Sequence, residues 1–236
     1  MKRIFRRRRR WLPAPCHLCS RDTTVPHGLC PACEREWRAL TGRPRCPGCG
    51  LLMPGADGEE AMPCGACRRR PRAFDAAIAA VDLEASARHL VHRLKYHHDF
   101  SVLSLLSDTL LQAVRDTQAP PWPQALVPMP VHPARRRRRG FNQAQLLARE
   151  LGRALGIPVC DRAVRRVRDT GSLTALDAAA RRRTLRGAFE ADGPLPARVA
   201  IVDDVLTTGA SAEALTVVLR RAGAEQVSVW TVARTP

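Results

Sequence analysis

From residue 73 onward, hydrophobic positions alternate between short continuous runs and longer stretches with helical spacing. Continuous runs of five to seven residues indicate buried strands, and an apolar residue at every third or fourth position indicates an amphipathic helix. Strands are expected at 77–83, 125–129, 163–167, 199–203 and 226–232. Helices are expected at 84–96, at 101–115, from a cap at Asn142, at 177–187 and at 211–222.

Strands that alternate with helices predict an α/β fold with a mainly parallel sheet covered on both faces. Between the strand at 125–129 and the helix that begins near Asn142, we expect a loop that includes a run of arginines. Ligands of open parallel sheets bind at the carboxyl ends of the strands. The region 73–236 therefore predicts one domain with a ligand crevice at that edge.

The first 72 residues have a different pattern, in which cysteine pairs replace apolar periodicity. Eight of the nine cysteines form four CxxC pairs at regular spacing. Such pairs favour two closed, structural Zn2+ sites over disulfides, because two CxxC turns complete one tetrahedral sulfur shell. We expect Cys16, Cys19, Cys30 and Cys33 on one ion, and Cys46, Cys49, Cys64 and Cys67 on the other. Interleaved pairing and a dithiol redox relay are the alternatives, and the remaining Cys160 is expected in the core.

The charge is strongly positive, with a formal net charge of +17. Lysine occurs only at positions 2 and 95, so almost all of this charge is arginine, concentrated in residues 1–72 and 132–186. Basic patches of this kind suit a polyanion such as nucleic acid, although they can also be solvated faces. No apolar stretch has the length of a signal peptide or a membrane span, so we expect a soluble cytoplasmic protein without a membrane span.

The stretch AIVDDVLTTGAS at 200–211 contains the most specific candidate chemistry. Two carboxylates, Asp203 and Asp204, follow the apolar run and are expected at the carboxyl end of the strand. The residues Thr207, Thr208, Gly209, Ala210 and Ser211 then lead into a helix. Backbone amides at a helix N-terminus bind phosphate, and carboxylates accept hydrogen bonds from sugar hydroxyls. This combination predicts a ribose 5-phosphate site.

The same stretch resembles the 5-phosphoribosyl 1-pyrophosphate (PRPP) motif of type I phosphoribosyltransferases. Nearly the whole chain resembles the ComF family of bacterial competence proteins, which join a double zinc ribbon to a phosphoribosyltransferase-like domain. The resemblance rests on the four CxxC pairs and on the ordered stretches RLKYHHDF (93–100), LVPMPVHPARRRRRGFNQAQLLARELG (126–152), RVRDTGSLTALDAAARRRTLRGAF (166–189) and the PRPP-like motif. It implies a double zinc-ribbon module at 1–72 and a phosphoribosyltransferase-like domain at 73–236.

The resemblance also implies roles for individual residues. The PRPP ribose would lie on Asp203 and Asp204, with the 5-phosphate on residues 207–211. The pyrophosphate, with Mg2+, would lie on a loop that includes Pro130, Arg139 and Gly140. The chain departs from the family at Leu173, where family members usually have Gln; this change concerns the transfer chemistry rather than PRPP binding. No residue stands out as a general base, and catalytic residues remain unassigned.

For function, the resemblance implies handling of single-stranded DNA during DNA uptake and natural transformation, with a separate competence helicase as a candidate partner. The chain has no GxxxxGK[ST] loop of its own. The arginines Arg135, Arg136, Arg137, Arg138 and Arg139 are expected to face solvent beside the crevice and to contact DNA, with a smaller contribution from residues 6–10. Because few residues follow the PRPP-like motif, we expect any acceptor to be recognised before residue 120.

Two other functions fit the same residues. The chain could be a metabolic phosphoribosyltransferase that acts on a small base, or a non-catalytic regulatory module that senses PRPP. Product formation from PRPP would distinguish the first of these, and a PRPP-linked change in DNA affinity would favour the second.

Overall fold

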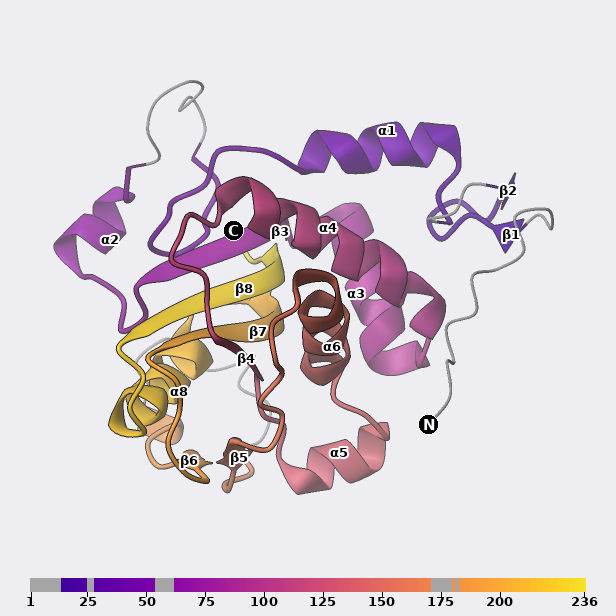
Figure 1. Ribbon diagram of the computed structural model, residues 1–236. Helices are drawn as coiled ribbons and strands as arrows, with labels where there is room; N and C mark the ends of the chain where they lie inside the picture. Colours follow the sequence, from indigo (N-terminus) through magenta and orange to yellow (C-terminus); the bar gives the residue numbers. More distant parts are fainter. Residues whose placement is uncertain (1–13, 25–27, 54–61, 171–179, 181–182) are drawn as a thin grey trace.

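The centre of the molecule is a four-stranded sheet in which all strands are parallel (Figure 1). The computed structural model describes residues 14–24, 28–53, 62–170, 180 and 183–236. The strands follow the order β3 (Ala76–Asp82), β8 (Gln226–Arg234), β7 (Arg198–Leu206) and β4 (Ala125–Pro128). The predicted α/β class with a parallel sheet is therefore confirmed.

Helices cover both faces of this sheet, as its strands are apolar on both sides. Along β7, Ala200 and Val202 belong to one hydrophobic cluster, whereas Val199 and Ile201 belong to the other. This division follows from the alternation of side chains along a strand. The first cluster is covered by α3 (Ala85–His97), the short η1 (Phe100–Val102), α4 (Leu103–Thr117) and α6 (Gln143–Leu155).

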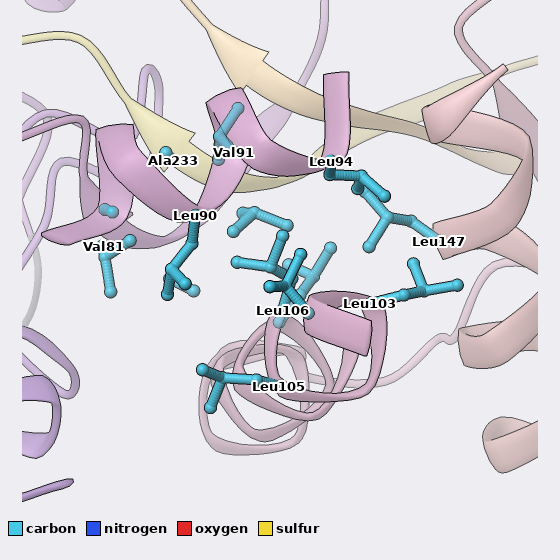
Figure 2. Packing of buried hydrophobic residues seen from close by; sticks show 14 of the residues in the cluster. Val81, Leu90, Val91, Leu94, Leu103, Leu105, Leu106, Leu147 and Ala233 are labelled. Atoms are coloured by element: carbon cyan, nitrogen blue, oxygen red, sulfur yellow. The ribbon is translucent and has the colours of Figure 1, made fainter. Parts of the chain in front are cut away.

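Figure 2 shows part of this first cluster, where leucines of α3 and α4 meet Leu147 of α6. The second cluster is covered by α8 (Ala210–Arg221), whose Leu215 and Leu219 are fully buried. Each sheet face thus has its own core, and the strand ends between these layers remain accessible to a ligand.

Strand β7 is longer than we expected, and this corrects the predicted position of the two aspartates. The apolar run predicts an end near residue 203, but the strand extends to Leu206. Asp203 pairs with Thr231 and Val205 pairs with Ala233, so the ladder to β8 continues past both carboxylates. Asp203 and Asp204 consequently have the rigid backbone of a central strand.

The arginine run forms a helix, α5 (Pro133–Arg139), where a loop was predicted. The sequence has signals for both ends of this helix. Pro133 stands at the first helical position, and Gly140, which adopts φ = 77°, ends the helix. The ring of His132 accepts a hydrogen bond from the Ala134 amide at 3.3 Å and so caps the first turn. Arginine is itself a good helix former.

A second correction concerns the segment after α6. The strand expected at 163–167 exists as β5 (Val164–Arg166), but it pairs antiparallel with β6 (Phe189–Ala191) in a separate small sheet. The sequence pattern did not predict β6. The helix expected at 177–187 is described only in part, with residues 180, 183 and 184 helical.

The N-terminal region forms two cysteine-rich modules at opposite ends of α1 (Pro31–Leu40), as Figure 1 shows. The first module contains the hairpin of β1 (Ala14–Pro15) and β2 (Asp22–Thr23), and the second ends in α2 (Gly65–Arg69). Trp37 of α1 is buried in the first cluster, and its indole Nε1 donates to Thr109 Oγ1 at 3.0 Å. This region therefore packs directly on α4.

The second module docks on the edge and on the end of the sheet. The carbonyl oxygen of Pro47 accepts a hydrogen bond from the Ala77 amide of β3 at 2.8 Å. The buried guanidinium of Arg234, the last residue of β8, donates to the carbonyl oxygens of Cys49 at 2.9 Å, of Leu206 at 3.1 Å, and of Thr207. Arg234 thus connects the second cysteine module to the end of β7. The domain boundary after residue 72 stays a prediction.

None of the helices in the described part of the chain is long and apolar enough to cross a membrane.

Replacing Arg234 by Met should lower the free energy of unfolding by about 3 kcal/mol, because buried carbonyl oxygens lose a charged donor. Urea denaturation monitored by circular dichroism measures this change. The control Arg153→Met removes an exposed i,i+3 pair with Glu150 and should cost less than about 1 kcal/mol. Equal stabilities of the two variants would show that Arg234 does not join the two regions.

Candidate functional site

Two clusters of four cysteines lie in the N-terminal modules. Their sulfur atoms lie within 4.8 Å of one another in each cluster. One cluster is Cys16, Cys19, Cys30 and Cys33, and the other is Cys46, Cys49, Cys64 and Cys67. The grouping is that of neighbouring pairs, as expected, and not an interleaved one.

The two clusters share one construction. In each, a CxxC turn contributes two sulfurs and the N-terminus of a short helix contributes two more. Cys30 and Cys64 are the N-caps of α1 and α2, and their amides donate to Cys16 Sγ at 3.3 Å and to Cys46 Sγ at 3.2 Å. Burial opposes ionisation of Cys16, but the backbone amides around it, with that of Cys19 foremost, lower the pKa of this thiol to about 6. The turn at Cys16 therefore favours a thiolate, whereas burial raises the pKa of Cys33 and of Cys49.

The sulfur spacing fits Zn2+. A tetrahedral ion with Zn–S bonds of about 2.3 Å requires sulfurs about 3.8 Å apart. The distance from Cys19 Sγ to Cys30 Sγ is 3.6 Å, and that from Cys49 Sγ to Cys64 Sγ is 3.8 Å. Four sulfurs fill the coordination shell and leave no position for a substrate. Both clusters are structural Zn2+ sites.

A cavity of about 700 Å³ lies at the carboxyl ends of β4 and β7. Its wall combines the C-terminal end of α3, the segment after β4, the start of α6, the end of β5 and the turn that leads into α8. Its charged residues are Lys95, Arg135, Arg138, Arg139, Arg166, Asp169, Asp203 and Asp204. Cations outnumber carboxylates in this wall, which favours an anionic ligand.

Asp203 and Asp204 form the acidic part of the cavity. Lys95 Nζ lies 2.7 Å from Asp204 Oδ2, and Asp203 Oδ1 accepts from the Asp204 amide at 2.9 Å. Burial and the negative charge of Asp204 raise the pKa of Asp203 well above its ordinary value. Burial opposes the charge of Lys95, but Asp204 outweighs this effect and the pKa of the ammonium is raised. A ligand with hydroxyl groups can donate further hydrogen bonds to these two side chains.

The turn between β7 and α8 is held from behind by two arginines. Arg72 Nη1 donates to the carbonyl oxygen of Thr208 at 3.1 Å and pairs with Glu213 at 3.0 Å, while Arg234 donates to the carbonyl oxygen of Thr207. With these carbonyl oxygens occupied, the turn is fixed at the N-terminus of α8. Gly209 adopts φ = 85°, and a Cβ at this position would lie 3.4 Å from Arg72 Nη1.

Of the five residues expected in the phosphate cradle, Thr207 and Ser211 line the cavity. Thr208, Gly209 and Ala210 form the turn behind them, with Gly209 as the N-cap of α8. Such an N-terminus offers amides and a positive dipole end to an anion.

The segment after β4 contributes Pro130 and Arg139 to the cavity wall, whereas Gly140 serves as the end of α5 and does not line it. Asn142 fixes this segment, because its side chain donates to the Met129 carbonyl oxygen at 3.0 Å and accepts from the Ala144 amide at 3.0 Å. Arg139 donates to Gln143 Oε1 at 2.7 Å.

The arginines of α5 divide between the cavity and solvent. Arg135, Arg138 and Arg139 line the cavity, while Arg136 and Arg137 are exposed and lie outside its wall. Arg138 is exposed as well as lining the cavity, so the expectation that most of the run faces solvent beside the cavity is confirmed for Arg136, Arg137 and Arg138. Helical geometry determines this division, because residues three and four apart share a face.

Two cationic residues of the wall were missed in the sequence. Lys95 belongs to RLKYHHDF and Arg166 to RVRDTGS, stretches that resemble the family without an assigned role. Arg166 is only 8% exposed, and its Nε has no hydrogen-bond partner among the described residues. Burial and the neighbouring Arg135 lower the pKa of its guanidinium. A lone arginine gives no sequence signal for such a role, since burial arises only in the folded chain.

Leu173 and residues 6–10 lie outside the described residues. Cys160 is partly buried against the second cluster, and burial raises the pKa of its thiol, as expected for a core cysteine.

Comparison with known proteins agrees with this architecture. Residues 9–68 match the family model for the double zinc ribbon domain. DNA utilization protein YhgH from Escherichia coli K12 is 35% identical over 229 residues, which cover 95% of this chain and 98% of that protein. Competence protein F from Haemophilus influenzae is 34% identical over 215 residues, covering 88% and 91%. The chain belongs to the ComF family.

Among solved structures, the glutamine PRPP amidotransferase from B. subtilis matches with a TM-score of 0.35 and 21% identity, covering 54% of this chain and 25% of that one. The purine phosphoribosyltransferase from Pyrococcus horikoshii matches with a TM-score of 0.34 and 20% identity, covering 57% and 74%. The ComF chain has a four-stranded parallel sheet with an N-terminal double zinc ribbon.

Purified protein should contain two zinc ions per chain by elemental analysis, because both four-sulfur shells are complete. Cys46→Ser should leave one ion and destabilise the second module, which Arg234 joins to β8, whereas Cys160→Ser should leave both ions. One ion or none in the wild type would contradict the two-site assignment.

Proposed function

We propose that this ComF protein binds PRPP in the cavity and single-stranded DNA along α5, and that it acts in DNA uptake and natural transformation. The observation that carries the proposal is the buried, incompletely hydrogen-bonded guanidinium of Arg166 in the same wall as Asp203 and Asp204. A ligand that satisfies both must have anionic groups and hydroxyl groups close together. PRPP has both.

In this proposal each part of the ligand has its own partners. The ribose hydroxyls donate to Asp203 and Asp204, and the 5-phosphate binds the turn that includes Thr207 and Ser211 at the start of α8. Arg166 and the cationic end of α5 are available to the pyrophosphate. Guanidinium groups suit phosphate because their donors form a planar fork.

Mg2+ fits this site only together with the ligand. Outside the two cysteine clusters, the described residues contain no group of three or more ligating side chains that could hold a metal. Asp204 is paired with Lys95, and Asp169 lies 3.5 Å from Arg135 Nε. Mg2+ commonly binds through substrate phosphates and one or two carboxylates, and Asp203 is the nearest candidate for such a carboxylate. When bound, the ion would neutralise the charge of the pyrophosphate.

The assignment to DNA handling rests on α5 and on the relatives. Exposed arginines in one short helix provide charge for a phosphate backbone without reading bases. The relatives are named as DNA utilization and competence proteins. We place the protein in the cytoplasm, where thiolate zinc sites are stable, and a competence helicase is its candidate partner.

Asp203→Asn combined with Asp204→Asn should lower PRPP affinity on the order of 100-fold, because the ribose hydroxyls lose a charged acceptor at Asp204 and a carboxyl partner at Asp203. The rise in melting temperature with PRPP and Mg2+, measured by differential scanning fluorimetry, should then disappear. The control Asp116→Asn changes an exposed carboxylate of α4 and should keep the wild-type rise. A double variant that is stabilised like the wild type would refute the site.

Arg136→Gln combined with Arg137→Gln should lower the slope of log DNA affinity against log salt by about 1.4, or roughly 0.7 per lost phosphate contact. Fluorescence anisotropy with a short oligonucleotide at several salt concentrations measures the slope. PRPP affinity should not change, because neither side chain lines the cavity.

The charge-matched control for this variant is Arg115→Gln with Arg153→Gln, which removes two exposed arginines from α4 and α6. If both double variants keep the wild-type slope, α5 is not the DNA contact.

A further inference from the structure

Two exposed aromatic side chains stand where α3 ends and η1 begins: Tyr96 in the last turn of α3 and Phe100 at the start of η1. Tyr96, the single tyrosine of the chain, is 60% exposed, and Phe100 is 39% exposed. They are the only aromatic residues among the exposed large hydrophobic side chains of the described ranges. Single exposed hydrophobic side chains are common, so the significance of these two depends on what lies around them.

Two small groups of rings meet at the cavity wall through Tyr96 and His98, and we call them together the aromatic platform: His92, Tyr96, His98, Phe100 and Phe141. The ring centroids of His92 and Tyr96 are 4.6 Å apart, and those of Phe100 and Phe141 are 5.0 Å apart. His98 meets Phe141 edge to face at 5.5 Å. The contacts hold the rings at the surface, and a rigid ring loses little conformational entropy when a ligand binds.

The platform is continuous with the cavity and with the arginine helix. Tyr96 and His98 line the cavity, and the guanidinium carbon of Arg139 lies 5.5 Å from the centroid of the Tyr96 ring. Cations for phosphates and rings for bases therefore lie side by side. This pairing of basic and aromatic side chains is typical of proteins that bind unpaired strands.

We propose that the aromatic platform stacks the unpaired bases of single-stranded DNA while α5 holds the phosphates of the same strand. The proposal rests on the proposed function, because it names the second half of the DNA site. The strand then crosses the mouth of the cavity, beside bound PRPP. Stacking on ring faces does not distinguish bases, so the platform binds strands of any sequence.

The test compares two labelled strands of equal length and charge, one of thymidines and one in which the central bases are replaced by abasic sites. Fluorescence anisotropy should show that the full-length wild-type protein binds the base-containing strand at least about fivefold more tightly. Tyr96→Ala should abolish this preference without changing the salt slope, and Tyr96→Phe should keep it. Val217→Ala, at an exposed apolar position on α8, should match the wild type. Because Tyr96 is exposed, its variants should fold, which circular dichroism verifies.

The possible outcomes distinguish failure of the platform proposal from failure of the proposed DNA function. If the wild type binds both strands equally and with strong salt dependence, the protein binds DNA through phosphates alone and the platform proposal is wrong. The platform is likewise overturned if Tyr96→Ala keeps the preference, or if it weakens only the binding of a free nucleobase such as adenine. If the wild type binds neither strand at low salt, both the proposed DNA function and the platform are wrong.

Discussion

The buried guanidinium of Arg234 connects three parts of this molecule. It lies at the end of β8 and donates to carbonyl oxygens of the second zinc module, of the end of β7, and of the turn before α8. An arginine so far from water is stable only when its donors are satisfied, so the three segments must keep their relative positions. Together with Arg72, which holds the next carbonyl oxygen, it makes the geometry of the turn depend on the zinc ribbon. The ribbon is thus a structural part of the site and not a separate appendage.

Several charged side chains of the cavity wall are partly or fully buried, although burial of charge costs free energy. Asp203 and Asp204 repel each other within a central strand, and among the residues that the structure describes only Lys95 forms an ion pair with one of them. Arg166, in the same cavity wall, is buried, and its Nε has no hydrogen-bond partner in the described part of the chain. Such an arrangement costs stability in the ligand-free protein, and sites that bind charged ligands often accept this cost. A ligand with phosphate and hydroxyl groups can supply acceptors to Arg166 and hydrogen-bond donors to the two aspartates.

The sequence predicted well those features that depend on local patterns. The main strands appear as apolar runs, Asn142 caps its helix as expected, and the spacing of the CxxC pairs led to both zinc sites. It predicted poorly those features that tertiary contacts decide. Strand β7 continues past Asp203 because β8 pairs with it, and Arg135–Arg139 form a helix although like charges adjoin. The roles of Lys95 and Arg166 depend on burial and on partners distant in the sequence, which no local pattern contains.

Isothermal titration calorimetry of the zinc-loaded protein with PRPP and Mg2+ measures directly whether the cavity is a PRPP site. We expect a saturable heat with one PRPP bound per chain, and we expect pyrophosphate to compete with PRPP, since both need the same cations. A flat titration with folded, zinc-loaded protein would contradict the assignment of this cavity.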